Sequence, residues 1–401
     1  METALDAFRQ DLFDRLSATS TDFHRYLFRQ IDWEARLLCV KGAKGVGKTT
    51  MLLQHIKESG IPFEEVLYIS LDDLWFNSNS LTELVGHAYR HGIRHLYMDE
   101  VHCFKQWQTA IKNFYDKYPL LHIVYTGSSM LQLDANQGDL SRRLDDYTLS
   151  GLSFREYLEY EGIANVNPVT LNEMTSNHVT IAMDVAGRTG SVLKHFGDYL
   201  RHGYYPFYKE AGLSLSRRIQ NIVRQVLDVD YPAIDDVEFE TIQKAKKMLM
   251  VLAESVPQTP SMNELYQQLE TSRQQGLKML YALERAGLLA MLTDRTKNLK
   301  NLGRPEKIFL NNPNLMYALG QKTDIGTVRE TFFINQVGNC HTLKYPPKGD
   351  FLVDDHYLFE VGGKTKKFNQ IKDIENSFLA VDDMEIGFGN KIPLWIFGLL
   401  Y

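Results

Sequence analysis

The sequence predicts an α/β protein in which a parallel sheet, with helices on both faces, is built around a phosphate-binding loop. Two observations predict this fold class. In the first 150 residues, short apolar segments alternate with helical patterns, and the connections between them are short. The segment 42–49 also fills the complete pattern G-x-x-x-x-G-K-[ST]. The second half combines helical patterns with a few short strands, which predicts a helical region followed by a small α/β domain.

The first half can be divided into elements by its apolar periodicity and its turn residues. Strands of the sheet are expected where short apolar runs end in glycine or polar residues, and helices where apolar residues recur every three or four positions. The expected strands are 36–41, 65–71, 93–100, 121–127 and 147–150, and the expected helices are 4–16, 49–58, 81–88 and 104–118. The aromatic stripe of the helix 104–118 is interpreted as core, and Ser153 and Glu156 form a capping box for the next helix.

The phosphate-binding loop is the most specific signal in the chain. Glycines allow its backbone N–H groups to surround an anion, and the helix that follows adds its positive N-terminal end. Lys48 is long enough to reach the β- and γ-phosphates of a nucleotide, and the Thr49 hydroxyl can bind Mg²⁺. A glycine-rich turn that matches by chance is the alternative. The predicted ATP-binding residues are Gly42, Ala43, Lys44, Gly45, Val46, Gly47, Lys48, Thr49 and Thr50.

A pair of carboxylates ends the apolar strand 93–100. In a nucleotide site, the first acid of such a pair, Asp99, holds Mg²⁺, and the second, Glu100, orients and deprotonates the attacking water. The strand 121–127 ends in Ser128 and Ser129, whose hydroxyls could sense the γ-phosphate or serve an ordinary turn. The spacing of about fifty residues between the loop and the acidic pair favours a hydrolytic site.

These motifs together resemble the AAA-type ATPases of bacteria and archaea that carry a C-terminal domain of unknown function. The resemblance implies an AAA-like sheet in which the strand ending at Gly127 lies between the strands of the two nucleotide motifs. It also implies that Asp99 is the metal-side acid, Glu100 the catalytic base and Ser128 a sensor. The segments that carry the resemblance are, in order, 42–50, 96–100, the helix of Trp107, 126–129 and 152–157.

The resemblance also aligns Arg143 with an arginine of the family. Such a residue can neutralise charge in the transition state, within one chain or across a subunit interface. Arg142 stands where the family has glycine, and Gly151 where it has proline. A solvated basic turn is therefore the alternative interpretation of Arg143.

Length and composition limit the possible classes of protein. The chain has 401 residues, which predicts two or three domains, and its net charge of −6 gives no overall basic signal. Contact with nucleic acid would therefore need a local basic patch. The three cysteines are far apart and odd in number, which excludes a disulfide framework and a cysteine-rich zinc site and favours a reducing cytosol. They are Cys39, Cys103 and Cys340.

Signals for secretion or membrane insertion are missing from the sequence. The segment 1–6 lacks the basic start and apolar core of a signal peptide. The longest apolar run, 392–401, has ten residues and contains Pro393 and Gly398, so it is too short to span a bilayer. We therefore expect a cytoplasmic protein without membrane contacts.

The segment 241–312 predicts a winged helix. Three helical patterns precede two short strands, and the loop between the strands is basic, as a DNA-contacting wing requires. A winged helix that binds protein is the alternative, because the presumed reading helix is not especially basic. The cations of the loop are Arg295, Lys297, Lys300 and Arg304.

The last segment, 313–401, contains acidic residues near strand ends that are followed by lysine. Such a set could bind Mg²⁺ and activate water on a phosphodiester, and its order resembles the PD-(D/E)xK nuclease core. Glycine stands where the nuclease lysine is expected, and the lysine is displaced by two positions, so we favour a degenerate nuclease-like fold used for binding. The residues of this second site are Glu330, Asp350, Glu360 and Lys364.

The sequence thus predicts four regions and two functional hypotheses. The first hypothesis is an ATPase that hydrolyses Mg-ATP and couples this to its C-terminal region, acting on DNA, a protein partner or further copies of itself. The alternative is an ATP-regulated protein that binds or cleaves DNA through its C-terminal domain. The regions are an ATPase domain (1–160), a helical lid or linker (161–240), a winged-helix-like domain (241–312) and a nuclease-like domain (313–401).

Overall fold

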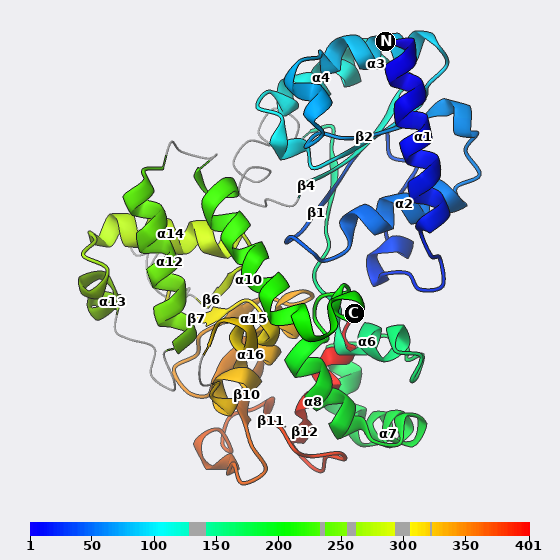
Figure 1. Cartoon of the computed structure of the whole chain (residues 1–401). Coiled ribbons are helices and arrows are strands. Elements are labelled where there is room, and N and C mark those ends of the chain that lie inside the picture. Colours follow the sequence, from blue (N-terminus) through cyan, green and yellow to red (C-terminus); the bar gives the residue numbers. More distant parts are fainter. Residues whose placement is uncertain (128–141, 233–236, 255–261, 293–304, 321–322) are drawn as a thin grey trace. The chain divides into compact units, whose positions relative to one another are not determined.

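The structure is a computed structural model that describes residues 1–127, 142–232, 237–254, 262–292, 305–320 and 323–401 (Figure 1). The chain divides into two compact units, Met1–Ser150 and Gly151–Tyr401. The finer division expected at residues 160, 240 and 312 stays a prediction. Each unit is built by its own sequence pattern.

The first unit contains a parallel sheet with the strand order β2-β3-β4-β1-β5. Strand β4 lies between β1 and β3, the two strands that lead into the nucleotide motifs, as the resemblance implies. The predicted α/β fold with an AAA-like parallel sheet is therefore confirmed. The strands are β1 (Leu37–Lys41), β2 (Val66–Ser70), β3 (His95–Asp99), β4 (His122–Gly127) and β5 (Asp145–Thr148).

Helices cover both faces of this sheet (Figure 1), so the strands β1 to β4 read as nearly continuous apolar runs. Alternate residues enter two separate cores. Leu37 and Cys39 pack with α3 (Leu81–Arg90) and α4 (Trp107–Lys117), whereas Leu38 and Val40 pack with α2 (Lys48–Glu58). Helix α1 (Glu2–Ala18) contributes to both cores. The aromatic residues Trp107 and Phe114 are buried, so their interpretation as core is confirmed.

The second unit begins with helices. The predicted capping box is present at α6 (Phe154–Tyr160), where Ser153 and Glu156 each accept a hydrogen bond from the other's backbone N–H. The larger helices that follow are α7 (Leu171–Thr189), α8 (Val192–His202), α10 (Leu215–Gln225), α12 (Phe239–Glu254), α13 (Met262–Gln268), α14 (Arg273–Arg285), α15 (Pro313–Leu319) and α16 (Ile325–Gly338).

Two strands between α14 and α15 pair in an antiparallel sheet. They are β6 (Leu289–Leu292) and β7 (Lys307–Leu310). Three helices followed by a strand pair are thus present where the sequence predicts a winged helix. The basic residues expected between the strands lie outside the described residues.

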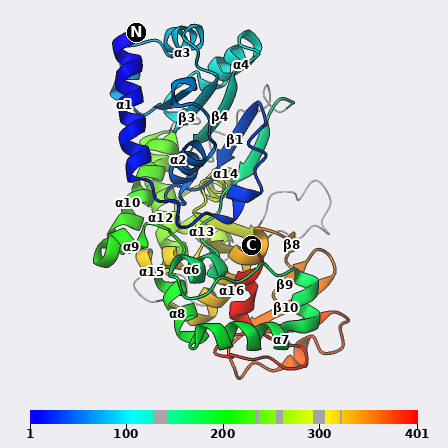
Figure 2. The same cartoon turned by 90° about the vertical axis from the view of Figure 1, so that its right-hand side faces the viewer.

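A separate mixed sheet with the order β12-β11-β10-β9-β8 lies near the C-terminus. Helix α16 packs on β10 (Figure 2), and its Phe333 ring lies 4.7 Å from Phe351, 5.3 Å from Phe359 and 4.8 Å from Phe397. This small α/β arrangement is the predicted one. The strands are β8 (Leu343–Lys344), β9 (Phe351–Val353), β10 (Tyr357–Gly362), β11 (Ser377–Val381) and β12 (Lys391–Pro393). Across the described residues of both units, no helix is both long and apolar enough to cross a membrane.

Candidate nucleotide-binding site

The phosphate-binding loop joins β1 to α2, and three of its glycines are needed for different reasons. Gly45 and Gly47 have φ angles of 85° and 99°, a backbone conformation that disfavours other residues. Gly42 has an ordinary φ, but a Cβ atom there would lie only 2.3 Å from the carbonyl oxygen of Leu149. Gly47 is also the N-cap of α2, so the loop leads directly into the positive end of that helix.

Lys48 lies inside the loop. Its side chain is buried, and the Nζ atom donates hydrogen bonds to the carbonyl oxygens of Gly42 at 2.9 Å and Ala43 at 3.0 Å. Burial of an ammonium group is unfavourable unless such acceptors surround it. The loop therefore holds a cation where the phosphates of a nucleotide would lie.

The two nucleotide motifs meet at Asp99. The Thr49 hydroxyl donates to the Asp99 Oδ2 atom at 2.6 Å, although the two residues are fifty positions apart. Tyr68 also donates to Oδ2, at 3.2 Å, and Thr126 donates to Oδ1. The backbone N–H of Glu100 donates to Oδ1 at 3.1 Å. Neighbouring parallel strands end at the same edge of the sheet, which explains why residues from β2, β3 and β4 converge here.

This donor set fits Mg²⁺. A hydroxyl and a carboxylate are hard oxygen ligands, and Mg²⁺ in nucleotide sites usually takes its remaining ligands from water and phosphate. Within the described part of the chain, no three histidine, cysteine, aspartate or glutamate side chains are grouped so that they could hold a metal ion. Thr49 and Asp99 would therefore hold the ion together with the nucleotide.

Glu100 follows β3 with a left-handed backbone, at a φ of 51°. Its Oε2 atom lies 3.4 Å from Nδ1 of His102, and the histidine side chain is buried. Burial lowers the pKa of His102, and Lys44 and Lys48 lower it further, whereas Glu100 raises it. The lowered pKa keeps the imidazole neutral at pH 7, so the Glu100 carboxylate lies beside an uncharged His102 side chain.

Of the two remaining residues that were predicted to act in catalysis, the structure describes one. The Arg143 guanidinium lies 3.3 Å from an Asp116 carboxylate oxygen and 5.7 Å from the centre of the Tyr115 ring, so it contacts α4. Ser128 lies outside the described residues. The roles of both residues stay predictions.

The C-terminal acids come close to a different lysine from the one expected. Glu360 is buried and pairs with Lys366 at 2.9 Å, whereas the expected Lys364 is exposed and lies 3.9 Å from Asp383. The Asp350 carboxylate accepts a hydrogen bond from the Val361 backbone N–H at 2.8 Å.

Glu330 completes this charged group. It pairs with Lys307 at 2.5 Å. Burial raises the pKa of Glu330; Lys307 and Lys366 lower it, and Asp350 raises it. The structure thus gathers Glu330, Asp350 and Glu360 around Lys366, and it places two of the three acids in ion pairs.

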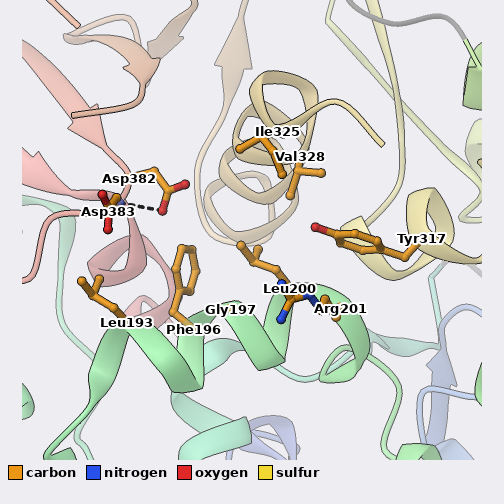
Figure 3. Close-up of a pocket in the computed structure, with 10 residues that line it drawn as sticks. All are labelled: Leu193, Phe196, Gly197, Leu200, Arg201, Tyr317, Ile325, Val328, Asp382 and Asp383. Carbon is orange, nitrogen blue, oxygen red and sulfur yellow. Dashed lines mark hydrogen bonds between the residues drawn. The ribbon is translucent and has the colours of Figure 1, made fainter. Parts of the chain in front are cut away.

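A separate pocket of about 210 Å³ lies in the second unit, between α8, α15, α16 and the turn after β11 (Figure 3). Its walls combine apolar side chains, among them Phe196 and Val328, with the charged residues Arg201, Asp382 and Asp383. Of its two acidic side chains, Asp382 accepts a hydrogen bond from Arg329 Nε at 2.8 Å. The pocket contains none of the site residues predicted from the sequence.

Sequence reasoning missed four residues of these sites. Tyr68 and Thr126 look like ordinary strand residues, and only the strand order brings them to Asp99. His102 stands two positions after Glu100, which was a usable signal. Lys366 follows a turn after β10, where strand periodicity no longer predicts the direction of a side chain.

Comparisons with known proteins agree with the first site. Residues 34–158 match the family model of an AAA domain, and residues 193–326 match a domain of unknown function. An uncharacterized protein of Methanocaldococcus jannaschii is 28% identical over 374 residues, which cover 84% of this chain and 78% of that protein. The AAA match includes both nucleotide motifs and supports an ATPase-type function.

Solved structures add only distant similarities. AMPPCP-bound DnaA from Aquifex aeolicus is 16% identical, with 64% of this chain and 84% of that chain covered and a TM-score of 0.26. The Hsp104:casein complex of S. cerevisiae is 12% identical, with 69% and 49% covered and a TM-score of 0.29. At these scores the alignments carry no argument about function.

Proposed function

We propose that this protein is an ATPase that binds Mg-ATP at residues 42–50 and hydrolyses it by in-line attack of a water molecule oriented by Glu100. The observation that carries the proposal is the 2.6 Å hydrogen bond between Thr49 and Asp99. It joins the phosphate-binding loop to the acidic strand end, which are the two parts that phosphoryl transfer requires.

Each residue has a defined task in the proposed reaction. The backbone N–H groups of the loop and the Lys48 ammonium bind the phosphates, and Thr49 and Asp99 hold Mg²⁺. Bound Mg²⁺ supplies neutralisation of the phosphate charge. Glu100 accepts a hydrogen bond from the attacking water and takes its proton. His102 lies beside the Glu100 carboxylate, on the side of Oε2.

Further parts of the proposal concern charge, partners and location. We assign Ser128 to sensing of the γ-phosphate and Arg143 to stabilisation of transition-state charge, within the chain or across an interface between copies. ATP turnover is proposed to act, in the cytoplasm, on the C-terminal region and through it on DNA or a protein partner. The mass of the complex in ATP and in ADP reports whether copies associate.

Two substitutions test the ATPase. Lys48→Ala should abolish ATP binding, because it removes the cation of the loop. Glu100→Gln should keep ATP binding but lower kcat by roughly 100-fold or more, since the amide cannot accept the proton. Phosphate release and ATP binding are measured separately by a coupled assay and by calorimetry.

The matched controls are Lys117→Ala and Glu64→Gln, which change exposed residues of the same types in the same unit. Both controls should hydrolyse ATP like the wild type. Equal hydrolysis by the wild type and Glu100→Gln would remove Glu100 from the role of base.

A second candidate function is ATP-regulated DNA binding by the second unit. The observation that favours it is the run of three helices and an antiparallel strand pair, α12 to β7, because the segment joining the two strands carries four cations in the sequence. For the acids of the C-terminal sheet we propose a binding rather than a cleaving role, since Glu360 and Glu330 are already paired with lysines.

A further inference from the structure

We infer that Tyr68 is a positioning residue for the metal-binding carboxylate, and that its hydroxyl sets how strongly Mg²⁺ strengthens nucleotide binding. The inference rests on the proposed function. It concerns a side chain that no nucleotide motif contains. Tyr68 lies on β2, whereas the two motifs belong to β1, β3 and the segments that follow them.

Strand register places Tyr68 within reach of Asp99. Tyr68 of β2 pairs with Tyr97 of β3, and Asp99 lies two residues further along β3, so all three side chains are on the same face of the sheet. Diagonal neighbours on adjacent strands are within reach of aromatic side chains. The Tyr68 hydroxyl accordingly donates to Asp99 Oδ2 at 3.2 Å.

The same oxygen accepts the hydrogen bond from Thr49. Oδ2 therefore receives donors from the start of α2 and from β2, whereas Oδ1 receives Thr126 from β4. Thr49 is the residue expected to bind Mg²⁺ directly. Tyr68 and Thr126 hold the carboxylate from the protein side, which is how outer-shell partners fix the orientation of a metal ligand.

The Tyr68 side chain is buried, and its hydroxyl acts as a donor. The side chain is 2% exposed and packs in the core beneath α2, with Met51 and Leu52 among its neighbours in that core. An ionised carboxylate can only accept a hydrogen bond, so the Tyr68 hydroxyl, 3.2 Å from Asp99 Oδ2, is the donor.

A purely structural role makes a different prediction. A buried hydroxyl needs a hydrogen-bond partner, and Asp99 would then be only the acceptor that satisfies Tyr68. In that case removal of the hydroxyl changes stability but leaves the effect of Mg²⁺ on binding unchanged. Positioning is identified by a change in the metal-dependent part of the affinity.

The chain offers a matched control in Tyr97, the residue paired with Tyr68 across the strands. Tyr97 is 1% exposed and belongs to the same core, and its hydroxyl is not one of the donors to Asp99. Tyr97→Phe therefore removes the same atom from the same layer without touching Asp99.

The experiment measures the Kd of full-length protein for β,γ-methylene ATP, first in excess EDTA and then at saturating Mg²⁺. The ratio of the two Kd values is the metal-dependent gain, and it requires no turnover. For Tyr68→Phe we expect the Kd in EDTA to stay within about twofold of wild type and the gain to fall roughly tenfold, the lower end of the usual effect of an outer-shell substitution. Tyr97→Phe should keep the wild-type gain.

Three outcomes would overturn the inference. The first is an unchanged metal-dependent gain in Tyr68→Phe, and the second is an equal fall of this gain in Tyr97→Phe. The third is a loss of nucleotide affinity in Tyr68→Phe that is as large in EDTA as in Mg²⁺. Circular dichroism of each variant checks that it is folded. Failure of the wild type to bind the nucleotide would instead overturn the proposed function itself, and with it this inference.

Discussion

His55 shows how a single partly buried side chain makes the first unit sensitive to pH. It lies on α2, and its ring stacks on Trp33 with 4.0 Å between the ring centres and 6° between the planes. Burial, with a smaller contribution from His95, lowers the pKa of His55 to about 4. Between about pH 4 and pH 6.5, this imidazole is therefore neutral in the folded unit and protonated in the unfolded chain.

The sign of the pH effect follows from this shift. Between pH 6.5 and about pH 4 the unfolded chain binds a proton at His55 that the folded unit does not, so the free energy of unfolding falls as pH falls. The loss from pH 7 to pH 5 is up to about 2 kcal/mol for this residue. Between pH 7 and pH 5, the free energy of unfolding of His55→Gln should therefore fall by that much less than the free energy of unfolding of the wild type. At pH 7 the variant should be less stable than the wild type, because the stack on Trp33 is lost.

Urea unfolding followed by tryptophan fluorescence at the two pH values measures the difference. His91→Gln, which changes an exposed histidine of the same unit, is the control and should keep the wild-type pH dependence. If the free energy of unfolding fell equally in wild type and His55→Gln between the two pH values, His55 would not be the source of this pH dependence.

At the scale of elements, two glycines inside helices should respond to alanine in opposite directions. Gly187 lies in α7, and a Cβ atom there would meet nothing within 4 Å. Gly276 lies in α14, where a Cβ atom would lie 2.3 Å from the buried ring of Tyr266 in α13. Glycine is unfavourable inside a helix, but it permits α13 and α14 to pack closely.

We expect Gly187→Ala to raise the free energy of unfolding by roughly 0.5–1 kcal/mol, because alanine restricts the unfolded chain and favours the helix. Gly276→Ala should lower it by roughly 1–3 kcal/mol through overpacking against Tyr266. Thermal and urea unfolding of the two variants and the wild type measure both effects. Stabilisation by Gly276→Ala would contradict the close approach of the two helices.

The elements themselves were largely predictable from the sequence. The four strands from 36 to 127 appear within two residues of their expected bounds, because strands buried on both faces are continuous apolar runs ending in glycine or polar residues. The fifth strand, expected at 147–150, is found at Asp145–Thr148. Most residues of this edge strand are exposed, so the strand has no apolar run and its bounds could not be predicted accurately.

At the scale of the whole molecule, the sequence predicted which motifs meet but not what surrounds them. The meeting of Thr49 with Asp99 follows from two patterns at the ends of parallel strands. Thr126 reaches Asp99 because β4 lies beside β3, an order that the family resemblance implied. Tyr68 reaches it because β2 lies on the other side of β3, which no motif predicted. Lys366 replaces Lys364 beside Glu360 because the chain turns after β10, so the two-residue periodicity of a strand no longer applies.

A measurement of DNA binding by the full chain tests the second candidate function, ATP-regulated DNA binding by the second unit. With a net charge of −6, the protein has no overall attraction for DNA, so binding would depend on local cations such as Lys297 and Lys300. We expect a gel shift of duplex DNA at low salt that weakens steeply as salt rises, because bound cations release counterions. Replacing both lysines by alanine should reduce the shift and the salt dependence, whereas Lys105 and Lys117 replaced together should not.

The same incubation with Mg²⁺ and supercoiled plasmid tests for cleavage, with and without ATP. We expect no nicking, because Glu360 and Glu330 are paired with Lys366 and Lys307 and the described residues contain no group of acids arranged to hold a metal. Nicking that Glu360→Gln abolishes would show that the C-terminal acids cleave DNA and would overturn their assigned binding role. Absence of a shift at low salt would remove DNA as the partner, and the ATPase would then act on protein.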